Sequence, residues 1–206
     1  MIRMQVSDSH KMLFVHVQKT GGSSLDTMLE SHISDLRKVR RTPDRHAPLS
    51  RILKVEPELV HYWTFGFVRN PWDRMVSWWS MIQQAKARDD ERLGKLDRWK
   101  IMAGYPDFET FVMQGPEDDP AFGRPQYKML TTKTRRADFI GRQETYADDV
   151  RAVFARLGLP VPDEGAIERR NVSHDRKPYR DLYTPRTRDR VAEVFRRDIE
   201  VFAYDF

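Results

Sequence analysis

The sequence predicts an α/β fold in which a central parallel sheet is flanked by helices. Apolar runs of strand length alternate with segments whose apolar residues recur at helical spacing. Two of the predicted strands end in short turns that open directly into helices, an order that is typical of parallel sheets. The chain has 206 residues, which is enough for one full hydrophobic core. We therefore expect a single three-layer domain over residues 1–206.

The N-terminal half contains two predicted strand–helix pairs. The first pair is a strand over residues 12–17 and a helix over 24–35. The second pair is a strand over 63–68 and a helix over 72–88. Between the pairs, residues 37–51 are basic and polar and indicate no regular element. The helical spacing of the second helix comes from five apolar residues, Met75, Trp78, Trp79, Ile82 and Ala85.

The C-terminal half continues the alternation. Residues 107–114 predict a short helix whose first residue, an aspartate, is a suitable N-cap. Three prolines predict a loop over 115–125. A strand over 137–141 precedes a helix over 146–157. A last helix begins at Pro185, and its apolar face comprises Val191, Val194, Phe195, Ile199 and Phe202.

A Gly-Gly turn between the first strand and the first helix predicts an anion site. Such a turn directs backbone N–H groups and the positive helix end at one spot, where a phosphate binds. Lys19 adds a mobile charge, and nearby hydroxyl groups add donors. The alternative is an ordinary turn with a serine N-cap. The turn is not a Walker A loop, because its lysine precedes the glycines. The six residues are Lys19, Thr20, Gly21, Gly22, Ser23 and Ser24.

A second anion site is predicted where the strand over 63–68 ends. Arg69 lies at the strand tip, and Pro71 suits the first turn of the following helix. Arg74 and Ser77 are three residues apart, so both side chains can lie on one side of that helix. Arg69 and Ser77 together can bind an anion. The alternatives are a salt bridge for Arg69 and a solvated position for Ser77.

The two motifs together resemble those of the sulfotransferases that use 3′-phosphoadenosine 5′-phosphosulfate (PAPS). The motifs are Lys-Thr-Gly-Gly-Ser-Ser at 19–24 and Arg-Asn-Pro-x-x-Arg-x-x-Ser at 69–77. The most similar branch is the carbohydrate sulfotransferase type (family 2), found in bacteria and, with a membrane anchor, in the Golgi. The resemblance extends to residues 139–144 and to the C-terminal part of the chain. It departs at Gln18, where the family often has proline, and at Ser23, where it often has threonine.

The resemblance implies a P-loop-like fold and a transferase. The enzyme would move a sulfuryl group from PAPS to a hydroxyl or amine of an acceptor such as a carbohydrate, with 3′-phosphoadenosine 5′-phosphate (PAP) as product. It implies that residues 19–24 hold the 5′-phosphosulfate and that Arg69 and Ser77 hold the 3′-phosphate. The cofactor-binding set is therefore Lys19, Thr20, Gly21, Gly22, Ser23, Ser24, Arg69 and Ser77.

In-line transfer needs a cation at the leaving phosphate and a base for the proton of the acceptor. Lys19 is the expected cation. His46 is the expected base, because it lies between the two motifs, where related carbohydrate enzymes place a catalytic His or Glu. His174, His61 and Glu56 remain alternatives for the base. The transferred group carries less charge than a phosphoryl group, so we expect no metal requirement.

Composition limits the location and the partners. The net charge of +5 suits a polyanionic nucleotide. Cysteine is absent, which excludes disulfides and thiolate metal sites. Residues 1–11 are too polar for a signal peptide, and no apolar run approaches a membrane span. We therefore expect a cytoplasmic protein and make no prediction of its oligomeric state.

Two other function classes remain open at this point. A P-loop-like nucleotide kinase or phosphotransferase would need magnesium and ATP, and the position of Lys19 argues against it. A nucleic-acid-binding module would suit the basic charge. The aromatic residues, however, recur at helix-core spacing and do not alternate with basic residues, which argues against nucleic acid as a partner.

Overall fold

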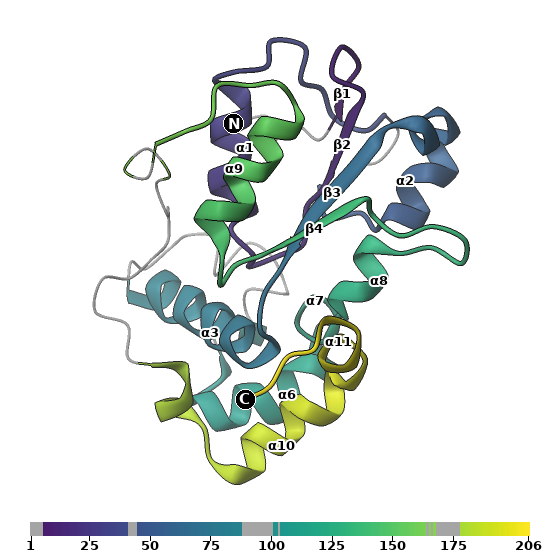
Figure 1. Ribbon diagram of the computed structural model, residues 1–206. Coiled ribbons are helices and arrows are strands. Elements are labelled where there is room, and N and C mark those ends of the chain that lie inside the picture. The colour runs from purple at the N-terminus through teal and green to yellow at the C-terminus, as the bar shows by residue number, and fades with distance from the viewer. Residues whose placement is uncertain are drawn as a thin grey trace. The chain divides into compact units, whose positions relative to one another are not determined.

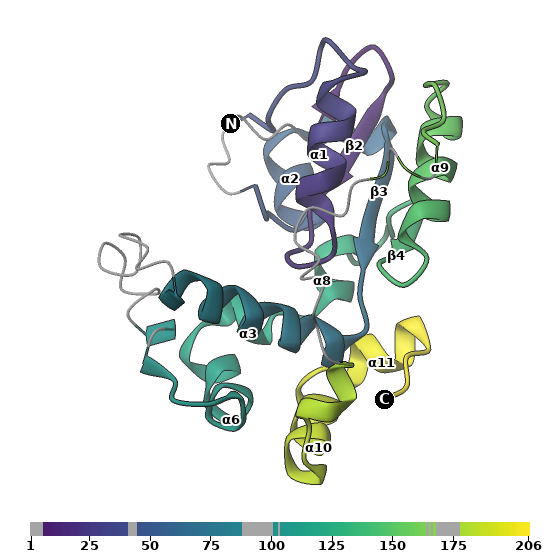
Figure 2. The ribbon, with the colours of Figure 1, turned by 90° about the vertical axis from the view of Figure 1, so that its left-hand side faces the viewer.

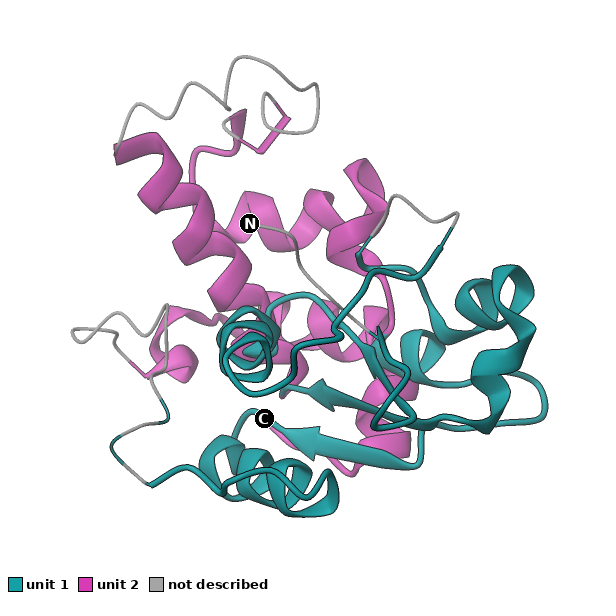
Figure 3. Cartoon of the chain, turned by 90° about the horizontal axis from the view of Figure 1, so that it is seen from above, with its two compact units in different colours: residues 1–69, 126–172 teal, residues 70–125, 173–206 magenta. Residues whose placement is uncertain are grey.

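The structure, a computed structural model, describes residues 6–40, 45–87, 101–102, 104–163, 165, 167 and 178–206. The chain divides into two compact units (Figure 3). The first unit comprises residues 1–69 and 126–172, and the second comprises residues 70–125 and 173–206. Each unit has a hydrophobic core of its own. The expectation of a single domain stays a prediction.

The first unit is built around a four-stranded sheet in the order β1-β2-β3-β4 (Figure 1). The strands are β1 (Val6–Ser7), β2 (Met12–Val15), β3 (Trp63–Val68) and β4 (Phe139–Arg142). β2, β3 and β4 run parallel, which confirms the predicted parallel arrangement for these three strands. β1 pairs with β2 in the antiparallel sense. The sheet is therefore mixed, and its two-residue edge strand was too short to predict.

Helices cover both faces of this sheet, as expected for three layers. α1 and α9 lie on one face of the sheet (Figure 1). Phe14, Phe65 and Phe67 share a hydrophobic core with these two helices. Gly66 points to the opposite face, where a Cβ on it would lie 2.4 Å from Leu130 of α8. The helices of this unit are α1 (Gly22–Glu30), α2 (Leu49–Val55), the 3-10 helix η1 (Pro57–His61), α8 (Gln126–Leu130) and α9 (Tyr146–Arg156).

The helix predicted over 24–35 is shorter and starts earlier than expected. α1 begins at Gly22 and ends at Glu30. Ile33, near the end of the predicted helix, is buried in the structure but lies beyond the end of α1. Side chains stop the helix, because both the Ser31 hydroxyl and the ring of His32 bond to the carbonyl oxygen of Met28. α2 begins within residues 37–51, where no regular element was predicted. It was missed because a helix of seven residues shows little periodicity.

In the described residues of the second unit, all regular elements are helices (Figure 2). The predicted aspartate cap is confirmed, since Asp107 accepts a hydrogen bond from the backbone N–H of Thr110 at 2.8 Å. The predicted loop over 115–125 is wrong. α6 continues through Pro116, and Asp119 then caps α7. The helices are α3 (Pro71–Ala87), α6 (Phe108–Asp118), α7 (Pro120–Gly123), η3 (Tyr179–Leu182), α10 (Pro185–Val194) and α11 (Arg196–Phe202).

The last predicted helix is two helices in the structure. α10 begins at Pro185 as predicted, and Thr184 caps it with a capping box. The backbone leaves the helical region at Phe195, where φ is −108° and ψ is 21°, and α11 follows. The apolar spacing continued across this break, because Val191, Phe195 and Phe202 are buried on either side of it. Periodicity alone therefore could not reveal the break.

An ion-pair network links the turn between β1 and β2 to later segments of the first unit. Arg37 pairs with Asp8 at 2.8 Å and with Glu56 at 2.9 Å. The Tyr62 hydroxyl donates to Asp8 at 2.7 Å. Glu56 is buried and also accepts from the backbone N–H of Arg40. The structure thus gives Glu56, one of the alternative bases, a structural role.

This network predicts a pH-dependent contribution to stability. Hydrogen bonds from Arg37 and Tyr62 lower the pKa of Asp8 to about 2. Its contribution is present above the unfolded pKa of ~4 and is lost as the pH falls toward 2. Because Asp8 is exposed enough for solvent screening, we expect Asp8→Asn to cost only ~0.5–1 kcal/mol of unfolding free energy at pH 7. Urea denaturation of the wild-type protein and the variant at pH 7 and at pH 2 measures this loss of unfolding free energy.

The matched control for Asp8 is Asp148→Asn. Asp148 is highly exposed and pairs with Arg151 on the surface of α9. Its replacement should change stability little, and equally at both pH values. An Asp8→Asn cost that persists undiminished at pH 2 would contradict the network.

Candidate functional site

The turn between β2 and α1 has the backbone of an anion-binding loop. Lys19 has φ of 68° and Gly21 has φ of 86°, whereas Thr20 between them keeps a negative φ. Residues of positive and negative φ in alternation can turn successive N–H groups toward one side, the arrangement of a concave nest for anions. The nest leads directly into the N-terminus of α1, which adds the positive end of the helix dipole. The predicted strand–turn–helix geometry is therefore present.

Two close approaches explain why both turn positions are glycine. A Cβ on Gly21 would lie 2.6 Å from the Oε1 atom of Gln143 and 2.6 Å from the ring of Tyr146. A Cβ on Gly22 would lie 2.2 Å from Nε2 of His16. The Tyr146 hydroxyl also donates to the Gly21 carbonyl oxygen at 2.9 Å. Sequence reasoning missed Tyr146 and Gln143 as supports of the loop, because they lie more than 120 residues away.

The polar side chains of the turn divide into supporting and accessible groups. The Thr20 hydroxyl is buried and donates to the carbonyl oxygen of Val17 at 2.9 Å. It therefore braces the turn in this structure, whereas the sequence suggested it as a ligand donor. Lys19 and Ser23 are half-buried. The alternative of a serine N-cap is wrong, because the N-cap is Gly21 and no side chain caps the helix.

Arg69 lies next to the turn. β2 and β3 are parallel neighbours, with Val15 opposite Gly66, so the segments that follow them begin at the same sheet edge. The guanidinium Nη1 of Arg69 donates to the carbonyl oxygen of Lys19 at 3.2 Å. The structure thus brings together Arg69 and the first motif, which are 50 residues apart in sequence.

A buried glutamine holds the backbone of Arg69. The Arg69 N–H donates to Oε1 of Gln126 at 3.0 Å, and Nε2 of Gln126 donates to the Arg69 carbonyl oxygen at 2.7 Å. Gln126 is fully buried at the start of α8. This two-point clamp fixes the strand tip from which the arginine side chain projects. Nothing local in the sequence distinguishes Gln126 from a surface glutamine.

The rest of the second motif lies in the other unit. Ser77 is a half-buried residue of α3. Arg74, three residues before Ser77 in α3, is buried in the core of its unit. Its guanidinium donates to the carbonyl oxygen of Arg124 at 3.1 Å and lies 5.8 Å from the ring centroid of Phe195. The joint role of Arg69 and Ser77 at the 3′-phosphate stays a prediction.

His46 contacts the residue that leads into the turn. Its Nδ1 lies 3.1 Å from the carbonyl oxygen of His16, and the two imidazole rings meet edge-on with centroids 4.7 Å apart. Nε2 of His46 accepts from Nε of Arg45 at 2.8 Å. A carbonyl oxygen can only accept, so Nδ1 carries a proton, and Nε2 presents its lone pair to Arg45. Neutral imidazole with a lone pair on Nε2 is the form that a general base requires.

The other base candidates are placed less well. His61 is exposed at the end of η1 and precedes β3. The turn and Arg69 follow their strands, so His61 lies near the other end of a strand about 20 Å long. His174 lies outside the described residues. His46 is therefore the candidate that the described part of the first unit favours.

The described ranges also bear on metal binding and on membrane insertion. Within them, no group of three or more His, Asp or Glu side chains is arranged to hold a metal ion. Metal independence stays a prediction. None of the helices in the same ranges combines the length and the apolar character needed to cross a bilayer.

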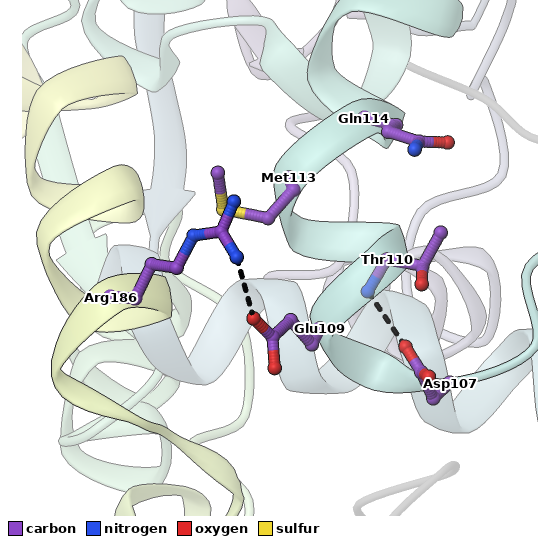
Figure 4. Close-up of a pocket in the computed structure, with 6 residues that line it drawn as sticks. All are labelled: Asp107, Glu109, Thr110, Met113, Gln114 and Arg186. Carbon is purple, nitrogen blue, oxygen red and sulfur yellow. Dashed lines mark hydrogen bonds and ion pairs between the residues drawn. The ribbon is translucent and has the colours of Figure 1, made fainter.

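A hollow of about 230 Å³ lies in the second unit, between α6 and α10 (Figure 4). Arg186 reaches across it toward Glu109, with 3.3 Å between Nη1 and Oε1. None of the predicted site residues lines this hollow. The lining comprises Asp107, Glu109, Thr110, Met113, Gln114 and Arg186.

Comparison with known proteins gives one family. Residues 3–205 match the model of the sulfotransferase family. Human carbohydrate sulfotransferase 14 is 24% identical over 174 residues, which are 75% of this chain and 46% of the human protein. The chain thus spans about half the length of that relative. The crystal structure of mouse sulfotransferase SULT7A1 complexed with PAP is 14% identical, with a TM-score of 0.46 over 92% of this chain and 84% of the mouse chain.

The close approach at Gly21 predicts a large cost for a single methyl group. Gly21→Ala should lower the free energy of unfolding by ~2–5 kcal/mol, of which the left-handed backbone accounts for ~1–2 kcal/mol and overpacking for the rest. Gly158→Ala is the matched control. Gly158 has φ of 68° and open space where a Cβ would be, so its cost should be ~1–2 kcal/mol. Equal costs in urea denaturation would show that Tyr146 and Gln143 do not confine the turn.

Proposed function

The chain belongs to the sulfotransferase family, and from that premise we propose that it transfers a sulfuryl group from PAPS to an acceptor, leaving PAP. The acceptor supplies a hydroxyl or amine group. The name of the human relative supports a carbohydrate as that acceptor. The cytoplasmic location expected from the sequence stays a prediction, which cell fractionation would test.

One observation carries this proposal. Two cationic anion-binding motifs follow neighbouring parallel strands, and the hydrogen bond from Arg69 to the Lys19 carbonyl oxygen joins them. Ligands of open α/β sheets bind at this carboxyl end of the strands. A nucleotide with phosphate groups at both its 5′ and 3′ positions needs two such motifs, whereas AMP or ATP needs one.

The residues present fit the nucleotide. The glycines let Tyr146, Gln143 and His16 pack closely against the turn, and these contacts hold the backbone of the nest in place. The nest and the start of α1 would hold the 5′-phosphosulfate, and Arg69 with Ser77 would hold the 3′-phosphate. Bound PAPS supplies a sulfur atom that is activated by a good leaving group.

Two side chains of the first unit carry the chemistry in this proposal. Lys19 would neutralise the charge that develops on the leaving phosphate. His46 would take the acceptor proton on Nε2, while its Nδ1–H stays bonded to the carbonyl oxygen of His16. Arg45 occupies Nε2 in this structure, so the acceptor must displace its guanidinium before the proton can move.

The proposal predicts that PAP binds far more tightly than AMP. The 3′-phosphate should add ~2–4 kcal/mol through charge-assisted hydrogen bonds, which is ~30–1000-fold in affinity by calorimetry. Arg69→Ala should remove most of this difference and barely change AMP binding. The control is Arg151→Ala, which removes a half-buried arginine of α9 from the same unit. Equal affinity of the wild-type protein for PAP and AMP would refute the proposed donor.

Lys19 and His46 should differ in what their loss changes. Lys19→Ala should lower turnover by ~10²–10³-fold, more than it weakens PAP binding, because its charge acts mostly in the transition state. His46→Ala should lower turnover by ~10²–10⁴-fold and leave PAP affinity intact. Turnover is measured as PAP release with a carbohydrate acceptor found by screening. A His46→Ala variant with near-normal turnover would place the base elsewhere.

A further inference from the structure

His16 lies between the two functional parts of the proposed site. It follows β2 directly and is only 3% exposed. One edge of its ring fills the space beside Gly22, where a Cβ would be 2.2 Å from Nε2. The ring also meets the ring of His46, with centroids 4.7 Å apart and an interplanar angle of 67°. A single imidazole therefore contacts both the anion loop and the candidate base.

Asp26 orients this ring from within α1. Its carboxylate is 4% exposed, and its Oδ2 lies 3.5 Å from Nδ1 of His16. A buried carboxylate is costly unless a cationic or donor group faces it, and His16 is such a group. With Nδ1 turned to Asp26, Nε2 is turned to Gly22. Both contacts come from α1, so this one helix confines the ring at two of its edges.

We propose that His16, oriented by Asp26, is a positioning residue that holds the anion loop and the ring of His46 in fixed register. This inference rests on the proposed function, because the relative position of the anion loop and the His46 ring matters only if donor and acceptor react there. Reacting groups must meet within a fraction of an ångström, and a misplacement of 1 Å can cost ~10²-fold in rate. Neither Asp26 nor the His16 ring needs to touch a substrate for this role.

Three variants test the inference. His16→Asn removes the ring and keeps an amide that can face Asp26. Asp26→Asn keeps the shape of the side chain and removes its charge, so it remains informative if His16→Asn does not fold. His32→Asn is the matched control, since it makes the same replacement in an exposed residue after α1 whose ring packs on Phe154.

The first readout needs neither nucleotide nor acceptor. Long-range proton–nitrogen NMR of the imidazole rings reports where His46 carries its proton. In the wild-type protein we expect one form, with the proton on Nδ1. In His16→Asn and Asp26→Asn we expect shifted or mixed His46 signals, and in His32→Asn unchanged ones. Unchanged His46 signals in both folded test variants would overturn the inference, whether or not PAP binds to the wild-type protein.

The second readout is a double-mutant cycle in turnover. His16→Asn should lower turnover by ~10–100-fold in the wild-type background and by less than ~3-fold in the His46→Ala background, because residues that act as a unit are not additive. PAP affinity should fall with His16→Asn and not with His32→Asn, since the ring also supports Gly22. Equal losses in both backgrounds would mean that His16 is merely a core residue. Failure of wild-type PAP binding would instead refute the proposed function.

Discussion

The parallel pairing of β2 with β3 is the constraint on which the candidate site depends. Val15 lies opposite Gly66, so the segments that follow both strands begin at one sheet edge. Gly66 permits this close packing, since a Cβ there would lie 2.8 Å from the Val15 carbonyl oxygen and 2.4 Å from Leu130. α8 can therefore lie flat on the sheet, and its first residue, Gln126, then reaches Arg69. The absence of a side chain at Gly66 thus allows the packing of α8 that places Gln126 against the backbone of Arg69.

The division of the chain into two units falls within the second motif. Arg69 ends a stretch of the first unit, and Asn70 begins the second. The Asn70 side chain bonds within the second unit. Its Nδ2 donates to the carbonyl oxygen of Asp205 at 2.8 Å, and its Oδ1 accepts from the backbone N–H of Trp72 at the start of α3. Arg69 is bonded within the first unit to Lys19 and Gln126. Adjacent residues of one motif therefore bond within different units.

Sequence patterns predicted three of the longer elements closely and the short ones poorly. β3 was predicted with its observed bounds, and α3 and α9 within one residue at each end. α2, α7 and α8 were missed, because helices of four to seven residues complete too few turns to show a period. The prolines of 115–125 were interpreted as loop residues. Pro120 instead occupies the first turn of α7, where its missing N–H costs nothing.

The sequence by itself determined the chemistry of the site, and the tertiary structure decided its geometry. The turn at 19–24 was predictable because glycine conformation, helix start and charge are local properties. The supports of the turn were not, because Tyr146 meets Gly21 across 125 residues and Gln126 meets Arg69 across 57. Likewise, the strand predicted over residues 12–17 includes His16, and only the fold set its ring between Gly22 and His46. Contacts between distant segments depend on how helices pack on the sheet, and no local spacing encodes that packing.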